Sequence, residues 1–164
     1  MPRTRQSFAP GHRRKFLVMV DGTPECDRAV TYAARRAART QGGLVLLAVL
    51  ELTDAPAQWL GVANLMRAEE TDKAEMRLAH YVARARTVAG VEPETAIREG
   101  SAAEALHAVV EADEDIAILA LASAAGPDGP GPLLTALVSG HWALPIPITI
   151  VPGTLTDADI EALA

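Results

Sequence analysis

The sequence predicts an α/β fold, with a single domain built on an open, Rossmann-like parallel sheet of five strands and helices on both faces. Five short apolar runs alternate with amphipathic helical patterns, so a helix-containing crossover joins each pair of successive strands. This arrangement is typical of parallel sheets with right-handed connections. Turn or capping residues separate the elements. The 164 residues suit one domain, and 49% hydrophobic residues provide a sizeable core.

The first two strands are continuous apolar runs, as expected for strands buried on both faces. FLVMV at 16–20 is the first, and LVLLAVLE at 44–51 is the second. The helix between them is predicted from Thr23 to about Thr40. Thr23 is expected to cap its free N–H groups and Pro24 to occupy its first position.

The middle of the sequence predicts a long helix and a shorter strand. The connection after the second strand becomes helical near Trp59, and the helix continues to about Ala89. ETAIREG at 94–100 alternates in polarity and is predicted as the third strand. Ser101 and Glu104 match a capping box at the start of the next helix.

The last third completes the alternation. IAILALAS at 116–123 is the predicted fourth strand, and a loop rich in glycine and proline follows it. A short helix over 133–138 and a fifth strand over 146–151 come next. A terminal helix capped by Thr156 is predicted after them. The chain is thus divided into an N-terminal arm (1–14), the α/β domain (15–153) and a helical tail (154–164).

Charge is unevenly distributed along the chain. The first 15 residues carry five basic side chains and no acidic one, whereas the rest carry 10 basic and 21 acidic ones. The acidic domain argues against a nucleic-acid surface. RNA, an anionic lipid and the acidic domain itself are alternative partners for the basic arm. The favoured interpretation is a solvated, disordered tail.

The only cysteine, Cys26, excludes an internal disulfide and is compatible with a cytoplasmic protein. Its place near a helix N-terminus lowers a thiol's pKa, although a lone cysteine is more often inert. No apolar run reaches the roughly 18 residues of a membrane helix. The basic N-terminus lacks the apolar core of a signal peptide.

Several nucleotide-binding and catalytic motifs are missing. The first turn, DGTPE, holds one glycine where a dinucleotide-binding fold has G-x-G-x-x-G, and no G-K-[ST] loop is found. The acid pair and lysine of a phosphoacceptor receiver domain are missing too. Neither a G-x-S-x-G elbow nor a histidine–cysteine metal spacing occurs. The sequence therefore predicts no catalytic residue and no metal ligand, and it favours a binding protein over an enzyme.

Ligands of open α/β sheets bind beyond the carboxyl ends of the strands, where the strand order reverses. The candidate residues therefore follow strands one, two and four, and the first of them are Asp21, Gly22, Thr23 and Val49. For Asp21, a ligand contact and a structural role as a cap are equally favoured. After the fourth strand, the segment 124–140 holds four glycines, which let a backbone approach phosphate, and three prolines, which lack N–H donors.

The first and the last part of the domain resemble the universal stress protein family. VMVDGTPECDRAVTYAARRAA followed by LVLLAVLE is similar to the family's first half. ILALASAAGPDGPGPLL and PIPITIVPG are similar to its last loop, helix and strand. The resemblance covers about residues 15–153. It implies the strand order 3-2-1-4-5, a homodimer paired through the last strand (Ile146 to Val151), and two branches, one of which binds ATP.

In the binding branch, the resemblance implies that Asp21 holds the ribose hydroxyls and that Val49 faces adenine. The phosphates are held by a loop of the form G-2x-G-9x-G-[ST]. Gly126 and Gly129 match the first spacing. At the second, this chain has Ser139 before Gly140, the reverse of the family's order.

The chemistry of the loop weakens a phosphate site. N–H donors remain at residues such as Gly129 and Gly131, but the three prolines supply none. Asp128 repels a triphosphate unless a divalent ion such as Mg²⁺ lies between them. No lysine or arginine follows Arg98. ATP is therefore less favoured than AMP, which rests on Asp21, Val49 and fewer loop donors.

Three functions are compared. The first is a cytoplasmic, homodimeric universal stress protein that acts in the stress response and has a weak or degenerate adenine-nucleotide (AMP or ATP) site. The second is a nucleotide-free homodimeric interaction module, whose loop and basic arm meet a protein partner. The third is a slow ATPase on the same scaffold. The sequence favours the first.

Overall fold

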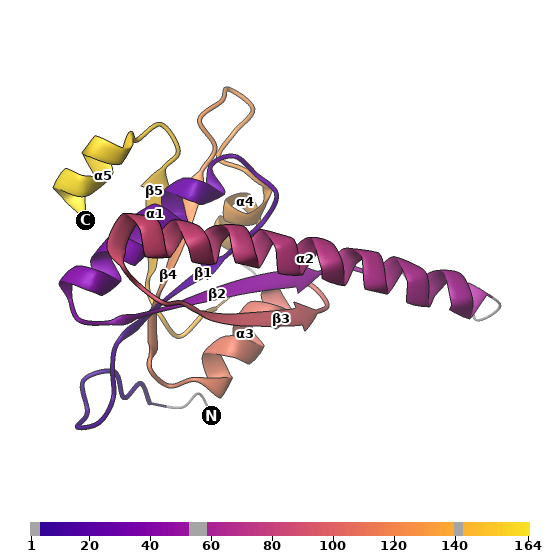
Figure 1. Cartoon of the computed structure of the whole chain (residues 1–164), viewed down its shortest axis with the longest axis horizontal. Coiled ribbons are helices and arrows are strands. Elements are labelled where there is room, and N and C mark those ends of the chain that lie inside the picture. The colour runs from indigo at the N-terminus through magenta and orange to yellow at the C-terminus, as the bar shows by residue number, and fades with distance from the viewer. Residues whose placement is uncertain (1–3, 53–58, 140–142) are drawn as a thin grey trace.

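The fold is a five-stranded parallel sheet with helices on both faces (Figure 1). The computed structural model describes residues 4–52, 59–139 and 143–164. The strand order is β3-β2-β1-β4-β5, which confirms the predicted fold and order. The strands are β1 (Lys15–Met19), β2 (Gly43–Leu50), β3 (Glu94–Glu99), β4 (Ile116–Ser123) and β5 (Ile148–Pro152). The helices are α1 (Cys26–Arg39), α2 (Leu60–Ala89), α3 (Ala102–Ala112), α4 (Pro132–Val138) and α5 (Asp157–Leu163).

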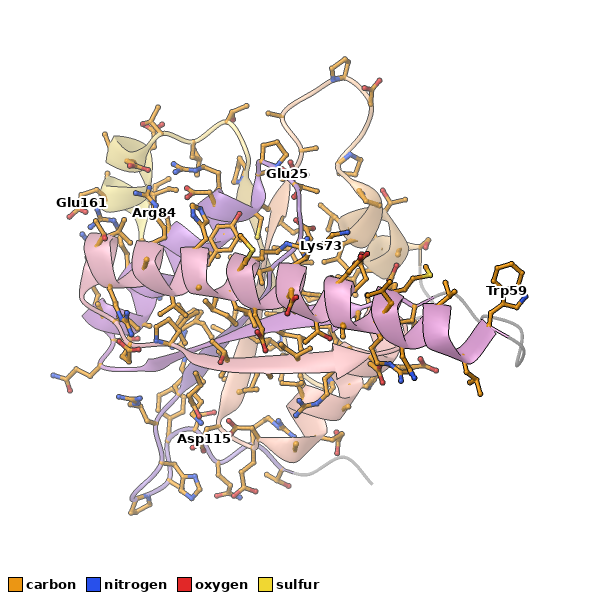
Figure 2. The ribbon with its side chains drawn as sticks, turned by 45° about the vertical axis from the view of Figure 1, so that its right-hand side comes forward. Glu25, Trp59, Lys73, Arg84, Asp115 and Glu161 are labelled. Carbon is orange, nitrogen blue, oxygen red and sulfur yellow. The ribbon has the colours of Figure 1, made fainter. Side chains whose placement is uncertain are left out.

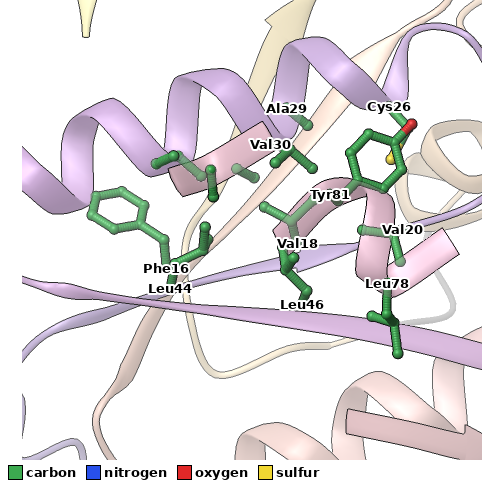
Figure 3. Close-up of a cluster of buried hydrophobic side chains, with 14 of the residues drawn as sticks. Phe16, Val18, Val20, Cys26, Ala29, Val30, Leu44, Leu46, Leu78 and Tyr81 are labelled. Carbon is green, nitrogen blue, oxygen red and sulfur yellow. The ribbon is translucent and has the colours of Figure 1, made fainter. Parts of the chain in front are cut away.

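Two hydrophobic cores lie on the two faces of the sheet. Phe16 and Val18 of β1 pack towards α1 and α2, and Leu17 packs towards α3 and α4. This division follows from the alternation of side chains along a strand. Figure 3 shows the first core, where Val30 of α1 lies above Val18. Burial on both faces explains why the central strands are apolar throughout.

Helix α2 is much longer than the sheet that it covers. Its buried residues all lie from the middle of the helix onwards and are Ala74, Leu78, Tyr81 and Ala85. The first half extends past the sheet (Figure 1). Trp59, just before the helix, is 53% exposed and stands at the far tip of this extension (Figure 2). The packed half positions α2 beside the carboxyl ends of β1 and β2.

The predicted capping box of Ser101 and Glu104 and the predicted cap at Thr156 are both confirmed. The Ser101 hydroxyl accepts the N–H of Glu104 at the start of α3, and the Glu104 carboxylate accepts the N–H of Ser101. Thr156 and Asp159 form the same reciprocal pair at the start of α5. Local spacing alone specified both helix starts.

The predicted start of α1 was wrong. The helix begins at Cys26, and Glu25 occupies the N-cap position without a side-chain hydrogen bond. The Thr23 hydroxyl accepts no N–H group of the helix and instead donates to the Asp21 carboxylate. Pro24 therefore lies in the turn before the helix. Asp21 accepts the Thr23 N–H in an Asx turn, and this turn places Thr23 ahead of the helix N-cap.

The N-terminal arm packs on the turn between α3 and β4. The Arg5 guanidinium donates to the carbonyl oxygens of Val110 at 2.7 Å and Asp113 at 3.0 Å. Ser7 is buried and donates to the carbonyl of Asp115. The sequence favoured a disordered tail, whereas residues 4–14 contact the acidic domain. The reason is that the last carbonyls of α3 lack helical partners and attract a cation.

None of the helices in the described residues has both the length and the apolar character that crossing a membrane requires.

Candidate functional site

A crevice lies at the carboxyl ends of β1 and β2, next to the point between β1 and β4 where the strand order reverses. It has a volume of about 380 Å³. Asp21 follows β1 and lines one wall, and Val49 near the end of β2 lines another. Glu70 and Arg77 of α2 close one side, and Leu133 of α4 contributes from the other. We call this hollow the crevice. The two residues expected to contact ribose and adenine therefore line the same space.

A smaller hollow adjoins the crevice below the start of α1. Its volume is about 20 Å³, which holds about one water molecule. Asp21 lines both hollows, and Thr23, Glu25 and Gly131 line the smaller one. The smaller hollow therefore extends the site towards α4 but has no room for a phosphate chain.

Asp21 is tied into the first turn by one carboxylate oxygen. Oδ1 accepts the Thr23 N–H at 2.9 Å and the Thr23 hydroxyl at 2.5 Å. Within the described residues, nothing donates a hydrogen bond to Oδ2. The structural role of Asp21 thus uses one oxygen and leaves the other available to a ligand.

Val49 supplies an apolar wall. It is half-buried at the end of β2, where it packs against the core on the α3 side. An apolar, partly exposed side chain and an acceptor carboxylate that line one hollow are the mixture typical of small-molecule sites.

The glycines of the loop after β4 lie apart from the crevice. The N–H of Ala124 donates to the Pro130 carbonyl at 3.0 Å, which closes the loop on itself. A Cβ added at Gly126 or Gly129 would meet nothing within 4 Å. Figure 1 shows this loop standing out from the body between β4 and α4. Gly131 does reach the smaller hollow, but the Glu25 carboxylate lies 3.5 Å from its Cβ position.

The other residues singled out from the sequence lie as follows. Gly22 sits next to Arg77, whose Nη2 would be 3.6 Å from a Cβ at that position. The exposed Ser139 hydroxyl donates to the Ala136 carbonyl within the last turn of α4. Gly140 lies outside the described residues. The structure thus brings together Asp21, Gly22, Thr23, Val49 and Gly131, but not Gly126, Gly129 or Ser139.

Sequence reasoning missed the two charged residues that α2 contributes to the crevice. Glu70 forms an ion pair with Lys73 at 2.8 Å. Arg77 is half-buried and forms no ion pair or hydrogen bond within the described residues. A signal was present, because Arg77 lies three residues after buried Ala74 and four before buried Tyr81. This spacing places Arg77 on the packed side of α2, where the sequence offered it as a candidate.

Cys26 is inaccessible beside the site. Its side chain is 4% exposed, and burial raises the pKa of the thiol to about 11. The Tyr81 hydroxyl lies against the sulfur (Figure 3), and burial raises the pKa of this phenol too. Both groups are therefore neutral at pH 7 and do not supply a nucleophile.

A family model matches most of the α/β domain. The model of the universal stress protein family matches residues 12–129. This chain belongs to the universal stress protein family. The match confirms the resemblance seen in the sequence, and it ends within the loop after β4. No curated protein matches the chain significantly.

Solved structures of family members share the fold. Universal stress protein UspA from Lactobacillus plantarum is 18% identical, with a TM-score of 0.71 over 84% of this chain and 97% of its own. A universal stress protein from Archaeoglobus fulgidus in complex with dAMP is 14% identical, with a TM-score of 0.60 over 84% and 97%. One from Arabidopsis thaliana with AMP bound is 18% identical, with a TM-score of 0.59 over 85% and 91%.

Proposed function

We propose that this universal stress protein acts in the stress response by binding an adenine mononucleotide, such as AMP, in the crevice. The observation that carries the proposal is that Asp21 and Val49, from the ends of neighbouring strands, line one hollow of about 380 Å³. Related structures hold AMP, dAMP and, in another case, cAMP, which supports a ligand of this class.

The roles follow from the chemistry of each side chain. The free Oδ2 of Asp21 accepts hydrogen bonds from ribose hydroxyls, while Oδ1 remains bonded to Thr23. Val49 packs against the adenine ring. A carboxylate held by its own turn is pre-organised, so little entropy is lost on binding.

The geometry favours a mononucleotide over ATP. Gly126 and Gly129 lie on a loop that is closed on itself and away from the crevice. Glu25 places a carboxylate beside Gly131, the loop glycine nearest the site. Among the described residues, a triphosphate thus meets no cradle of glycine N–H groups, and for the same reason we do not favour the slow ATPase. Mg²⁺ is expected only together with ATP.

The test is to identify and then remove the ligand. We expect mass spectrometry of the denatured, purified protein to release an adenine mononucleotide, and calorimetry to show AMP binding. Asp21→Asn keeps an Oδ1 acceptor for Thr23 but replaces Oδ2 with a donor, so AMP affinity should fall about 10-fold or more. Asp128→Asn, on the exposed loop, is the matched control. No heat and no thermal shift at millimolar AMP would refute the proposal and favour the nucleotide-free interaction module.

The edge strand β5 supports a homodimer. Ile148 is 38% exposed and Ile150 is 48% exposed, and β5 carries no charged residue. β3, at the opposite edge, carries Glu94, Arg98 and Glu99, which discourage strand pairing. We propose that two copies associate through β5, within the predicted segment Ile146 to Val151.

Light scattering after size exclusion tests this association. Ile150→Lys should convert the dimer to a monomer, because a lysine on the edge strand opposes pairing. Val62→Lys, on the exposed part of α2, is the control. A wild-type monomer, or an Ile150→Lys dimer, would contradict the proposal. A cytoplasmic location and a further protein partner stay predictions.

A further inference from the structure

The crevice has one basic side chain among its described lining residues, that of Arg77 in α2. Arg77 lines it together with Asp21 and Val49. The guanidinium lies over the first turn, next to Gly22, and is half-buried. It forms no ion pair or hydrogen bond with any described residue. Most of the other arginines of the domain pair with a carboxylate, as Arg84 does with Asp157.

The position of Arg77 is fixed by the packing of its helix. Ala74, Leu78 and Tyr81 are buried against the sheet on either side of it in sequence. The backbone therefore cannot rotate Arg77 into solvent without exposing these side chains. An unpaired guanidinium held at the rim of a hollow is suited to a ligand anion, because it offers several N–H donors in a planar fork.

The charges around the crevice restrict the anion. Asp21, Glu51 and Glu70 are acidic, and Arg77 is the only basic residue that lines it within the described chain. One guanidinium among three carboxylates accommodates one phosphate group and opposes the added charge of a triphosphate. Glu70 already pairs with Lys73, which leaves Arg77 to the ligand.

We infer that Arg77 binds the phosphate of the mononucleotide and thereby replaces the glycine loop as the anion-binding element of this site. The inference rests on the proposed function and deepens it, because it names the group that selects a singly phosphorylated adenosine. Asp21 holds the sugar from the end of β1, and Arg77 reaches the phosphate from α2.

Calorimetry with adenosine, AMP and ATP tests the role of Arg77. Wild-type protein should bind AMP about 10- to 100-fold more tightly than adenosine, and more tightly than ATP. Arg77→Gln should reduce the preference for AMP to about one while leaving adenosine affinity unchanged. Arg77→Lys should retain part of the preference, because it keeps the charge and loses the fork. Arg86→Gln, on the exposed side of the same helix, should behave as wild type.

A salt titration of the wild-type protein provides a test that needs no variant. The preference for AMP over adenosine should shrink between about 20 mM and about 0.5 M NaCl, because the ions screen a contact at the rim of an open hollow.

The outcomes separate the two proposals. If adenosine and AMP bind wild type equally, if Arg77→Gln keeps the preference, or if the preference ignores salt, the role of Arg77 is refuted and nucleotide binding stands. Equal loss of adenosine and AMP affinity in Arg77→Gln also refutes it, since Arg77 would then contact the base or sugar. If neither ligand binds wild type at millimolar concentration, the proposed function fails and the inference fails with it.

Discussion

The Asp21 carboxylate accepts both the backbone N–H and the hydroxyl of Thr23, at 2.9 and 2.5 Å, through the same oxygen. This pair joins the end of β1 to the start of α1, and it holds the carboxylate at the crevice. The stability of the turn and the affinity of the site are therefore linked.

Thr23→Val removes the hydroxyl and keeps the shape of the side chain. The half-buried carboxylate loses one donor, so we expect the free energy of unfolding to fall by about 1–2 kcal/mol. Urea denaturation measures this change, and AMP titration should show weaker binding. Thr23→Ser keeps the hydroxyl and should match wild type on both measurements. If Thr23→Val and Thr23→Ser had the same stability and the same AMP affinity, the hydroxyl would contribute to neither.

Two glycines, Gly126 in the loop after β4 and Gly153 just after β5, should respond differently to a change to alanine. A Cβ at Gly153 would collide with the backbone carbonyl of Ser123, whereas a Cβ at Gly126 would meet open space. Gly153→Ala should destabilise the protein by about 1–3 kcal/mol or prevent folding, because backbone atoms cannot yield as a side chain can. Gly126→Ala should change neither the melting temperature nor AMP affinity. Lost affinity in Gly126→Ala would show that the loop binds the ligand.

Cys26 should be unreactive in the folded protein. The pKa of the buried thiol is raised to about 11, so at pH 8 only about one molecule in 1,000 carries a thiolate, and solvent does not reach it. Alkylation by iodoacetamide, followed by mass spectrometry, should be slow in buffer and fast in urea. Rapid alkylation of the native protein would mean that the start of α1 opens readily.

The attachment of α5 should weaken in acid. Arg28, at 2.7 Å, and Arg84, at 2.9 Å, lower the pKa of Asp157. A carboxyl group whose pKa is lower in the folded protein stabilises it above the unfolded pKa, about 4, and this contribution is lost as pH falls through the folded value. Stability measured from pH 6 down to pH 2 should therefore decline, and part of that decline should disappear in Asp157→Asn.

Asp72→Asn serves as the matched control for this experiment, since Asp72 is exposed and forms no ion pair within the described residues. Its acid dependence should equal that of wild type. If Asp157→Asn also follows the wild-type curve, the ion pairs of Asp157 do not hold α5 in place.

The sequence by itself determined the elements and their order. Phe16–Val20 and Leu44–Glu51 predicted strands that the structure places within one residue, and the Ser101–Glu104 box marked the start of α3. These signals are local, because a strand period or a capping box involves residues a few positions apart. Where local signals competed, as for Thr23 between Asp21 and the helix, the boundary was misplaced by a few residues.

Only the tertiary structure decided which groups share the site. It set Arg77 of α2 beside Asp21, turned Gly126 and Gly129 away from the crevice, and packed Arg5 on the end of α3. These contacts join residues far apart in the chain. They depend on how helices pack on a twisted sheet, which no pattern of neighbouring residues encodes.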